Sequence, residues 1–171
     1  YWEKLEPEEN KFSYELIGQL ISGARSHEKK LILLWFGSWK NGLSTYIPAW
    51  IKKDTTRFPR VKDACGKNLR ILSMFESDIF QVEKNAFEHF MEHLKEIDKK
   101  ERTVIAVQVE NEVGVLGTTR DYSHDAQMLF EQTVPEILHG KQQTWKEQFG
   151  KDAEEAFMCY SYADYMGKLA E

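Results

Sequence analysis

The run Thr103-Val104-Ile105-Ala106-Val107-Gln108-Val109, which leads into Glu110-Asn111-Glu112, decides the fold. Its β-branched and apolar composition is that of a β-strand. A second apolar run, Leu31-Ile32-Leu33-Leu34-Trp35-Phe36, is bounded by lysines and Gly37. A short, wholly apolar run predicts a strand buried on both faces, as in a parallel sheet.

Helical patterns separate these two strands and follow them. Apolar residues recur with a helical period over 13–26 and 81–99. We expect further helices over 123–138, interrupted or offset near Pro135, and over 153–169. We also expect a strand end at 1–3 and a helical turn at 48–51. The sequence from there to about residue 80 is too weakly patterned to predict its structure. Alternating strands and helices predict right-handed βαβ units, and therefore an α/β fold with a parallel sheet.

Composition excludes several classes of protein. The 171 residues carry a net charge of −5 and no long basic stretch, which argues against a nucleic-acid partner. Two distant cysteines form neither a disulfide framework nor a zinc motif. No apolar run reaches membrane-spanning length, so a membrane partner is not expected. The chain opens without an initiator Met and without a signal peptide, so its compartment stays open, and a periplasmic or secreted location is compatible.

The strand over 103–109 ends in two carboxylates, Glu110 and Glu112, with Asn111 between them. Cleavage of a glycosidic bond needs a carboxylic acid that protonates the departing oxygen, and its pKa must be raised by burial or by a like charge. Glu112 follows an apolar strand and has a second carboxylate two residues away, so both influences are expected there. The alternative is a solvated turn, which is a common role for Glu-x-Glu.

The run Gln108-Val109-Glu110-Asn111-Glu112-Val113-Gly114 resembles the signature Gln-x-Glu-Asn-Glu-Tyr-Gly of glycoside hydrolase family 35, with Val113 in place of an aromatic residue. That family contains retaining β-galactosidases with a (β/α)8 TIM barrel. The resemblance implies that Glu112 is the general acid/base and that Asn111 binds the 2-hydroxyl of the sugar. Glu110 would contact the sugar or orient its neighbours. The substrate would be a β-galactoside or a close relative, and this chemistry requires no metal or organic cofactor.

Two further segments are similar to that family. Residues 2–12 match its Trp-x-x-His-Glu-Pro-x-x-Gly-x-Phe, with Leu5 and Asn10 as departures, and 42–50 match Gly-Gly-x-Pro-Ala-Trp. The loop over 35–41 is closer to a divergent bacterial branch. The resemblance implies that 1–171 form an incomplete barrel domain, from about the end of barrel strand 2 to the helices before strand 5. The chain is also short between Leu138 and Thr144 by comparison with the family.

An incomplete barrel has a consequence for activity. In the family the nucleophilic carboxylate follows the seventh strand, so we expect it outside these 171 residues, and we expect the isolated chain to be inactive. The exact sugar, its linkage and the oligomeric state stay open.

One loop carries candidate substrate-binding residues. Trp39, Lys40 and Asn41 offer an aromatic platform beside hydrogen-bonding groups, which is what sugar recognition needs. The alternatives are packing of Trp39 in the core and simple exposure of Lys40.

Two other functions fit parts of the sequence. His89-Phe90-Met91-Glu92-His93 matches the H-x-x-E-H motif of inverted zinc metalloproteases. However, the helical period puts both histidines on the side opposite the apolar stripe, where they would face solvent. The other alternative is a non-catalytic carbohydrate-binding module built on a barrel remnant, which would keep Trp39 and Asn41 but would not depend on Glu112.

Overall fold

The computed structural model describes residues 1–75, 77–138 and 142–171, apart from the side chain of residue 77. The segment between Leu138 and Thr144, which is short by comparison with the family, lies partly outside the described residues. In chain order the helices and strands are α1 (Trp2–Leu5), α2 (Glu15–Ser26), β1 (Leu31–Lys40), α3 (Ala49–Lys53), β2 (Arg60–Lys62), β3 (Asn68–Leu72), α4 (Ser77–Asp98), β4 (Val104–Asn111), α5 (His124–Phe130), η1 (Glu136–Leu138), α6 (Trp145–Phe149), η2 (Gly150–Asp152) and α7 (Ala153–Ala170).

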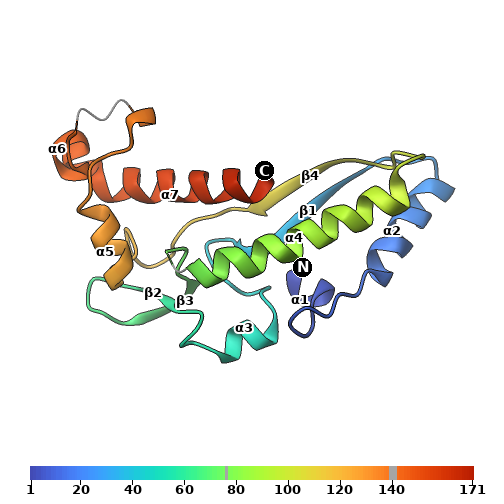
Figure 1. The fold of residues 1–171 in the computed structure, drawn as a ribbon, viewed down its shortest axis with the longest axis horizontal. Helices are drawn as coiled ribbons and strands as arrows, with labels where there is room; N and C mark the ends of the chain where they lie inside the picture. The colour runs from blue at the N-terminus through green and yellow to red at the C-terminus, as the bar shows by residue number, and fades with distance from the viewer. Residues whose placement is uncertain (76, 139–141) are drawn as a thin grey trace.

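The two predicted strands are confirmed and pair with each other. β1 and β4 are parallel, with Leu33 opposite Val107 and Trp35 opposite Val109. The long helix α4 lies between these two parallel strands in the chain, so the predicted βαβ alternation is present for β1 and β4, whereas β2 and β3 form a separate antiparallel hairpin. Figure 1 shows an elongated molecule in which α2 and the starts of β1 and β4 lie at one end and α5 and α6 at the other.

The core between β1 and α4 is aromatic. The indole of Trp35 lies 5.3 Å from the Phe87 ring, 5.4 Å from the Phe90 ring and 6.4 Å from the Trp2 ring. Trp2 belongs to α1, and Phe87 and Phe90 belong to α4. Because side chains alternate across a strand, Leu31, Leu33 and Trp35 share the face of β1 toward these two helices, whereas Ile32 and Leu34 lie on the opposite face. This register sets which face of β1 is available to a ligand.

The expected strand end at 1–3 is wrong, because these residues begin α1. The buried side chains of Trp2 and Leu5 lie three residues apart on one helical face. The carboxylate of Glu6 then accepts hydrogen bonds from Trp2 Nε1 (2.6 Å) and from the backbone N–H of Asn10 (2.7 Å). These bonds close a turn that an extended chain could not make.

The helix expected over 123–138 is present only in its first half, and it is interrupted earlier than the expected position near Pro135. α5 ends at Phe130, and Thr133 forms an isolated antiparallel bridge with Thr144 before the short η1 turn. Pro135 has no backbone N–H for an α-helical hydrogen bond, which disfavours an α-helix that continues through this position.

The β2–β3 hairpin and helix α6 were not predicted from the sequence, although turn-forming and helix-capping residues mark both of them. The β2–β3 hairpin turns at Asp63, whose Oδ1 accepts the N–H groups of Cys65 (2.9 Å) and Lys67 (2.9 Å), with Gly66 at φ +81°. α6 begins with a capping box between Thr144 and Glu147.

Candidate active site at the strand ends

The carboxyl ends of β1 and β4 bring the two sequence-predicted clusters together. Lys40 is in register with Asn111, and the N–H of Asn41 donates to the carbonyl of Asn111 at 3.3 Å. The N–H of Gly42 donates to the carbonyl of Glu112 at 2.9 Å. The loop after β1 and the Glu-Asn-Glu run therefore form one continuous surface at the end of the sheet.

The backbone at this edge adopts left-handed conformations at residues that seldom do so. Asn41, Glu110 and Glu112 have φ values of +55°, +61° and +51°. Such conformations cost free energy in residues other than glycine and cluster at functional sites, where surrounding contacts hold them in place.

Glu112 is exposed and Asn111 is half-buried. The Oδ1 of Asn111 accepts a hydrogen bond from Gln108 Nε2 at 3.0 Å, which fixes the amide on the strand. The burial that was expected at Glu112 is found at Glu110 instead. A ligand can therefore reach the Glu112 carboxylate directly.

Glu110 is buried, with 2% of its surface exposed. Its carboxyl group accepts the backbone N–H of Ser38 at 2.7 Å and that of Trp39 at 3.1 Å. Burial, followed by the nearby Glu83 carboxylate, raises the pKa of Glu110 well above its ordinary value. Of the two roles expected for Glu110, this geometry supports the orientation of neighbouring residues rather than contact with a sugar.

Trp39 is buried as well, with 1% of its surface exposed. Its indole packs edge-on against the rings of Tyr162 (5.2 Å) and Tyr165 (4.8 Å), and its Nε1 donates to the carbonyl of Leu72 at 3.3 Å. The structure thus places Trp39 in the core, as the alternative interpretation has it. Trp35 lies in the core too.

Lys40 and Asn41 lie at the surface beside the strand ends. The Nζ of Lys40 donates to Asn41 Oδ1 at 2.7 Å and lies 5.0 Å from the centre of the Phe36 ring. Lys40 is half-buried and Asn41 is exposed. Both therefore remain available for hydrogen bonds to a substrate.

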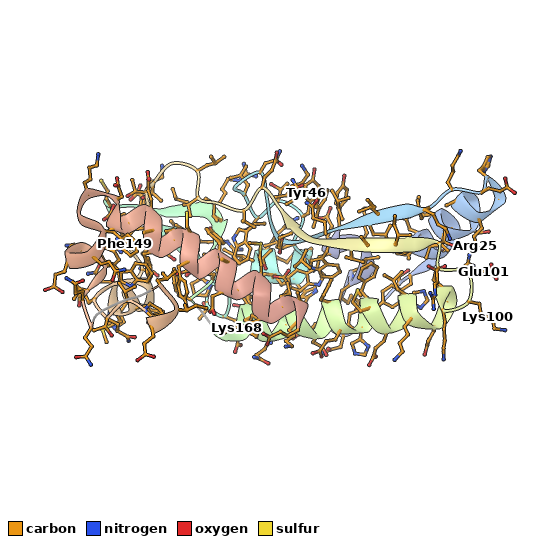
Figure 2. All side chains as sticks on the ribbon, turned by 90° about the horizontal axis from the view of Figure 1, so that it is seen from above. Arg25, Tyr46, Lys100, Glu101, Phe149 and Lys168 are labelled. Atoms are coloured by element: carbon orange, nitrogen blue, oxygen red, sulfur yellow. The ribbon has the colours of Figure 1, made fainter. Side chains whose placement is uncertain are left out.

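An aromatic cluster that the sequence analysis did not single out lies next to Lys40. The ring of Tyr1 stacks on Tyr46 at 4.1 Å and on Phe36 at 5.4 Å. Phe36 shares the strand face of Ile32 and Leu34, and Figure 2 shows Tyr46 on the side of β1 and β4 away from α4 and α7. The signal in the sequence was the alternation of β1, which puts Phe36 on the opposite face from Trp35.

The histidines of the H-x-x-E-H motif pack against aromatic rings. His89 lies 4.5 Å from the Phe12 ring, and His93 stacks on Tyr14 at 4.3 Å. In the described part of the chain no group of three or more His, Cys, Asp or Glu side chains could hold a metal ion. Cys65 and Cys159 are exposed free thiols. No helix within the described ranges is long and apolar enough to cross a membrane.

Comparison with solved structures identifies the fold. The chain is similar to the crystal structure of a β-galactosidase from Bacillus circulans sp. alkalophilus, with a TM-score of 0.59 and 16% sequence identity. The match covers 97% of this chain and 22% of that one, so the chain spans about a fifth of the length of this β-galactosidase. No curated protein matches the chain.

The family comparison corrects one part of the sequence interpretation. The β-galactosidase type is confirmed, but the family that matches, over residues 1–169, is glycoside hydrolase family 42 rather than family 35. The chain belongs to glycoside hydrolase family 42, the family described as β-galactosidase.

Proposed function

We propose that this chain supplies the general acid/base of a retaining β-galactosidase, and that Glu112 is that residue. The observation that supports it is an exposed Glu112 carboxylate on a strand end whose backbone is held by hydrogen bonds from Asn41 and Gly42. Asn111, fixed by Gln108, would bind the sugar hydroxyl next to the cleaved bond.

In this mechanism Glu112 first protonates the departing glycosidic oxygen while a second carboxylate attacks the anomeric carbon. Glu112 then takes a proton from the water that releases the sugar. The neighbouring Glu110 is unsuited to be the second carboxylate, because it is buried and accepts the N–H groups of Ser38 and Trp39. The nucleophile is therefore proposed to lie outside these 171 residues, and β1 and β4 to be neighbouring strands of a (β/α)8 barrel.

The aromatic cluster of Tyr1, Phe36 and Tyr46 is proposed as the platform for a sugar ring, with Lys40 and Asn41 as hydrogen-bonding partners. Sugar rings pack their apolar face on aromatic side chains, and this cluster lies on the open face of the strands. Tyr46→Ala in the full-length enzyme should raise KM with a smaller effect on kcat. An unchanged KM would remove the cluster from the substrate site.

The test of Glu112 uses the Glu112→Gln variant of the full-length enzyme and an activated aryl β-galactoside. Loss of the general base should slow sugar release by about 100-fold or more. Azide needs no deprotonation, so it should restore turnover and give a galactosyl azide of retained configuration.

The matched control is Glu88→Gln, which changes an exposed carboxylate on α4 and should leave turnover unchanged. Full activity of Glu112→Gln would show that Glu112 is not the general acid/base, and it would favour a non-catalytic, sugar-binding role for these 171 residues within the full-length enzyme.

A further inference from the structure

Two carboxyl groups from different elements meet in the core directly behind the strand end that carries Glu112. Glu83, on α4, has 0% of its surface exposed, and Glu110, on β4, has 2%. A Cβ atom added to Gly37 would lie 1.9 Å from Glu83 Oε1 and 2.6 Å from Glu110 Oε1. The two carboxyl groups therefore surround the same point on β1.

The hydrogen-bond donors around the two groups differ. Glu83 accepts from Trp35 Nε1 at 2.9 Å, from the Tyr165 hydroxyl at 3.0 Å and from the Ser38 hydroxyl, and also from the backbone N–H of Ser38 at 3.3 Å, which it shares with Glu110. Glu110 accepts the two backbone N–H groups of Ser38 and Trp39. Glu83 thus has the side-chain donors that suit a carboxylate anion, whereas Glu110 has fewer.

No ion pair reaches either carboxyl group within the described residues. Two adjacent buried anions without a counter-cation are strongly unfavourable, and one proton between them removes the repulsion. We infer that Glu83 and Glu110 share one proton, carried by Glu110 and donated to Glu83, and that this pair positions Asn111 and Glu112 for the reaction.

The surrounding titratable groups agree with this assignment. Tyr165 and Tyr162 of α7 face the pair, and burial raises the pKa of both phenols, in Tyr165 with a further contribution from Glu83 and in Tyr162 from Asp121. Both phenols therefore stay neutral, and the proton lost at alkaline pH is assigned to the carboxyl pair. Burial also raises the pKa of Glu110 well above its ordinary value.

The pair can act on the site through the backbone. Glu110 is joined to β1 through Ser38 and Trp39, and the next two residues are Asn111 and Glu112, of which Glu112 has a positive φ. Removing the shared proton would set two anions against each other and shift Glu110. Because small displacements of a reacting group reduce turnover strongly, activity should fall at alkaline pH.

The experiment has one readout that does not depend on catalysis. The infrared difference spectrum between the unmodified full-length protein and Glu110→Gln at neutral pH should contain the C=O stretching band of a buried protonated carboxylic acid. Absence of that band from the difference spectrum would overturn the inference even if no variant has measurable activity.

The kinetic readout rests on the proposed function. An amide at position 110 can still donate to Glu83 from the position of Oε1 and accept the Trp39 N–H with its oxygen. Glu110→Gln should therefore keep much more kcat than Glu110→Leu and should lose the alkaline limb of the pH profile. The Leu variant should lose about 10- to 100-fold in kcat with little change in KM. Equal losses in both variants would contradict a shared proton, and Glu88→Gln on the exposed face of α4 should change neither readout.

Failure of the two proposals can be told apart. If Glu112→Gln keeps full activity while the infrared band behaves as expected, the proposed function fails and the carboxyl pair stands. If the band is absent while Glu112→Gln loses turnover, the inference about the carboxyl pair fails and the proposed function stands.

Discussion

Gly37 is the single residue whose size decides whether the buried carboxyl pair fits against β1. A Cβ atom there would overlap Glu83 Oε1 at 1.9 Å and also the indole nitrogen of Trp35 at 2.4 Å. We expect Gly37→Ala to lower the free energy of unfolding by about 2 kcal/mol or more, because the contacts involve a packed core. Urea denaturation measures this change.

The control for Gly37 is Gly18→Ala in α2, where nothing lies within 4 Å of the added methyl group. Alanine favours the helix over glycine, so this variant should gain about 0.5–1 kcal/mol. A loss of stability at Gly18 as large as that at Gly37 would show that the effect is not a clash.

The raised pKa of Glu110 also predicts how stability depends on pH. Above the ordinary value of 4.5 the unfolded chain releases this proton, whereas the folded protein keeps it until its higher pKa is reached. Glu110 therefore contributes a loss of stability as pH rises through that window, with a slope of about 1.4 kcal/mol per pH unit. Glu110→Gln should flatten the curve of unfolding free energy against pH by that amount, and an unchanged slope would argue against a protonated Glu110.

The sequence predicts where a residue lies along a strand better than it predicts whether the side chain of that residue is buried or exposed. Glu110, Asn111 and Glu112 were placed at a strand end from the apolar run that precedes them. Which carboxylate is buried depends on two positive φ values that sequence periodicity does not encode. Trp39 failed as a platform for a related reason, since the partners that bury it, Tyr162 and Tyr165, come from the distant helix α7.

At the scale of elements, Asp98 at the end of α4 joins three segments. Its carboxylate accepts the N–H groups of Thr103 (3.0 Å) and Val104 (2.7 Å) and pairs with Arg25 of α2 at 2.5 Å. Figure 2 shows Arg25 at the end of the molecule where β4 begins. Burial opposes ionisation of Asp98, but these hydrogen bonds outweigh it and lower its pKa to about 2.

Asp98 should therefore stabilise the fold at neutral pH and cease to do so in acid. Its pKa is lowered from 3.8, so the contribution is present above that value and is lost as pH falls toward about 2. Asp98→Asn should cost about 2 kcal/mol at pH 7 and progressively less below pH 4 by chemical denaturation. Glu96→Gln, at an exposed position on the same helix, is the matched control, and an equal loss there would reject the argument.

Elements with a long, regular period were predicted closely, and those set by local chemistry were not. The helix expected over 81–99 and the last helix over 153–169 correspond to α4 and α7, because an apolar stripe must face the core over several turns. The β2–β3 hairpin and α6 are short, and the Asp63 turn and the Thr144–Glu147 cap determine them rather than periodicity.

At the scale of the whole molecule, one face of the β1–β4 pair carries apolar side chains that the described residues leave uncovered. Ile32 is 59% exposed and Leu34 is 44% exposed, although parallel sheets are normally covered on both faces. This face is the one that would line the inside of a (β/α)8 barrel, where side chains from the other strands would pack on it. The proposed barrel thus accounts for an exposed surface that composition alone does not explain.

The same geometry limits what these 171 residues can do alone. Retaining hydrolysis needs two carboxylates about 5–5.5 Å apart across the cleaved bond. Glu112 is exposed, but its neighbour Glu110 is buried and committed to Ser38 and Trp39, so it cannot attack a sugar. We therefore expect the isolated 171-residue polypeptide to show no hydrolysis of an aryl β-galactoside, while the full-length enzyme hydrolyses it. Turnover by the isolated polypeptide that disappears in Glu112→Gln would place the nucleophile within these residues and would refute the proposed division of the catalytic pair.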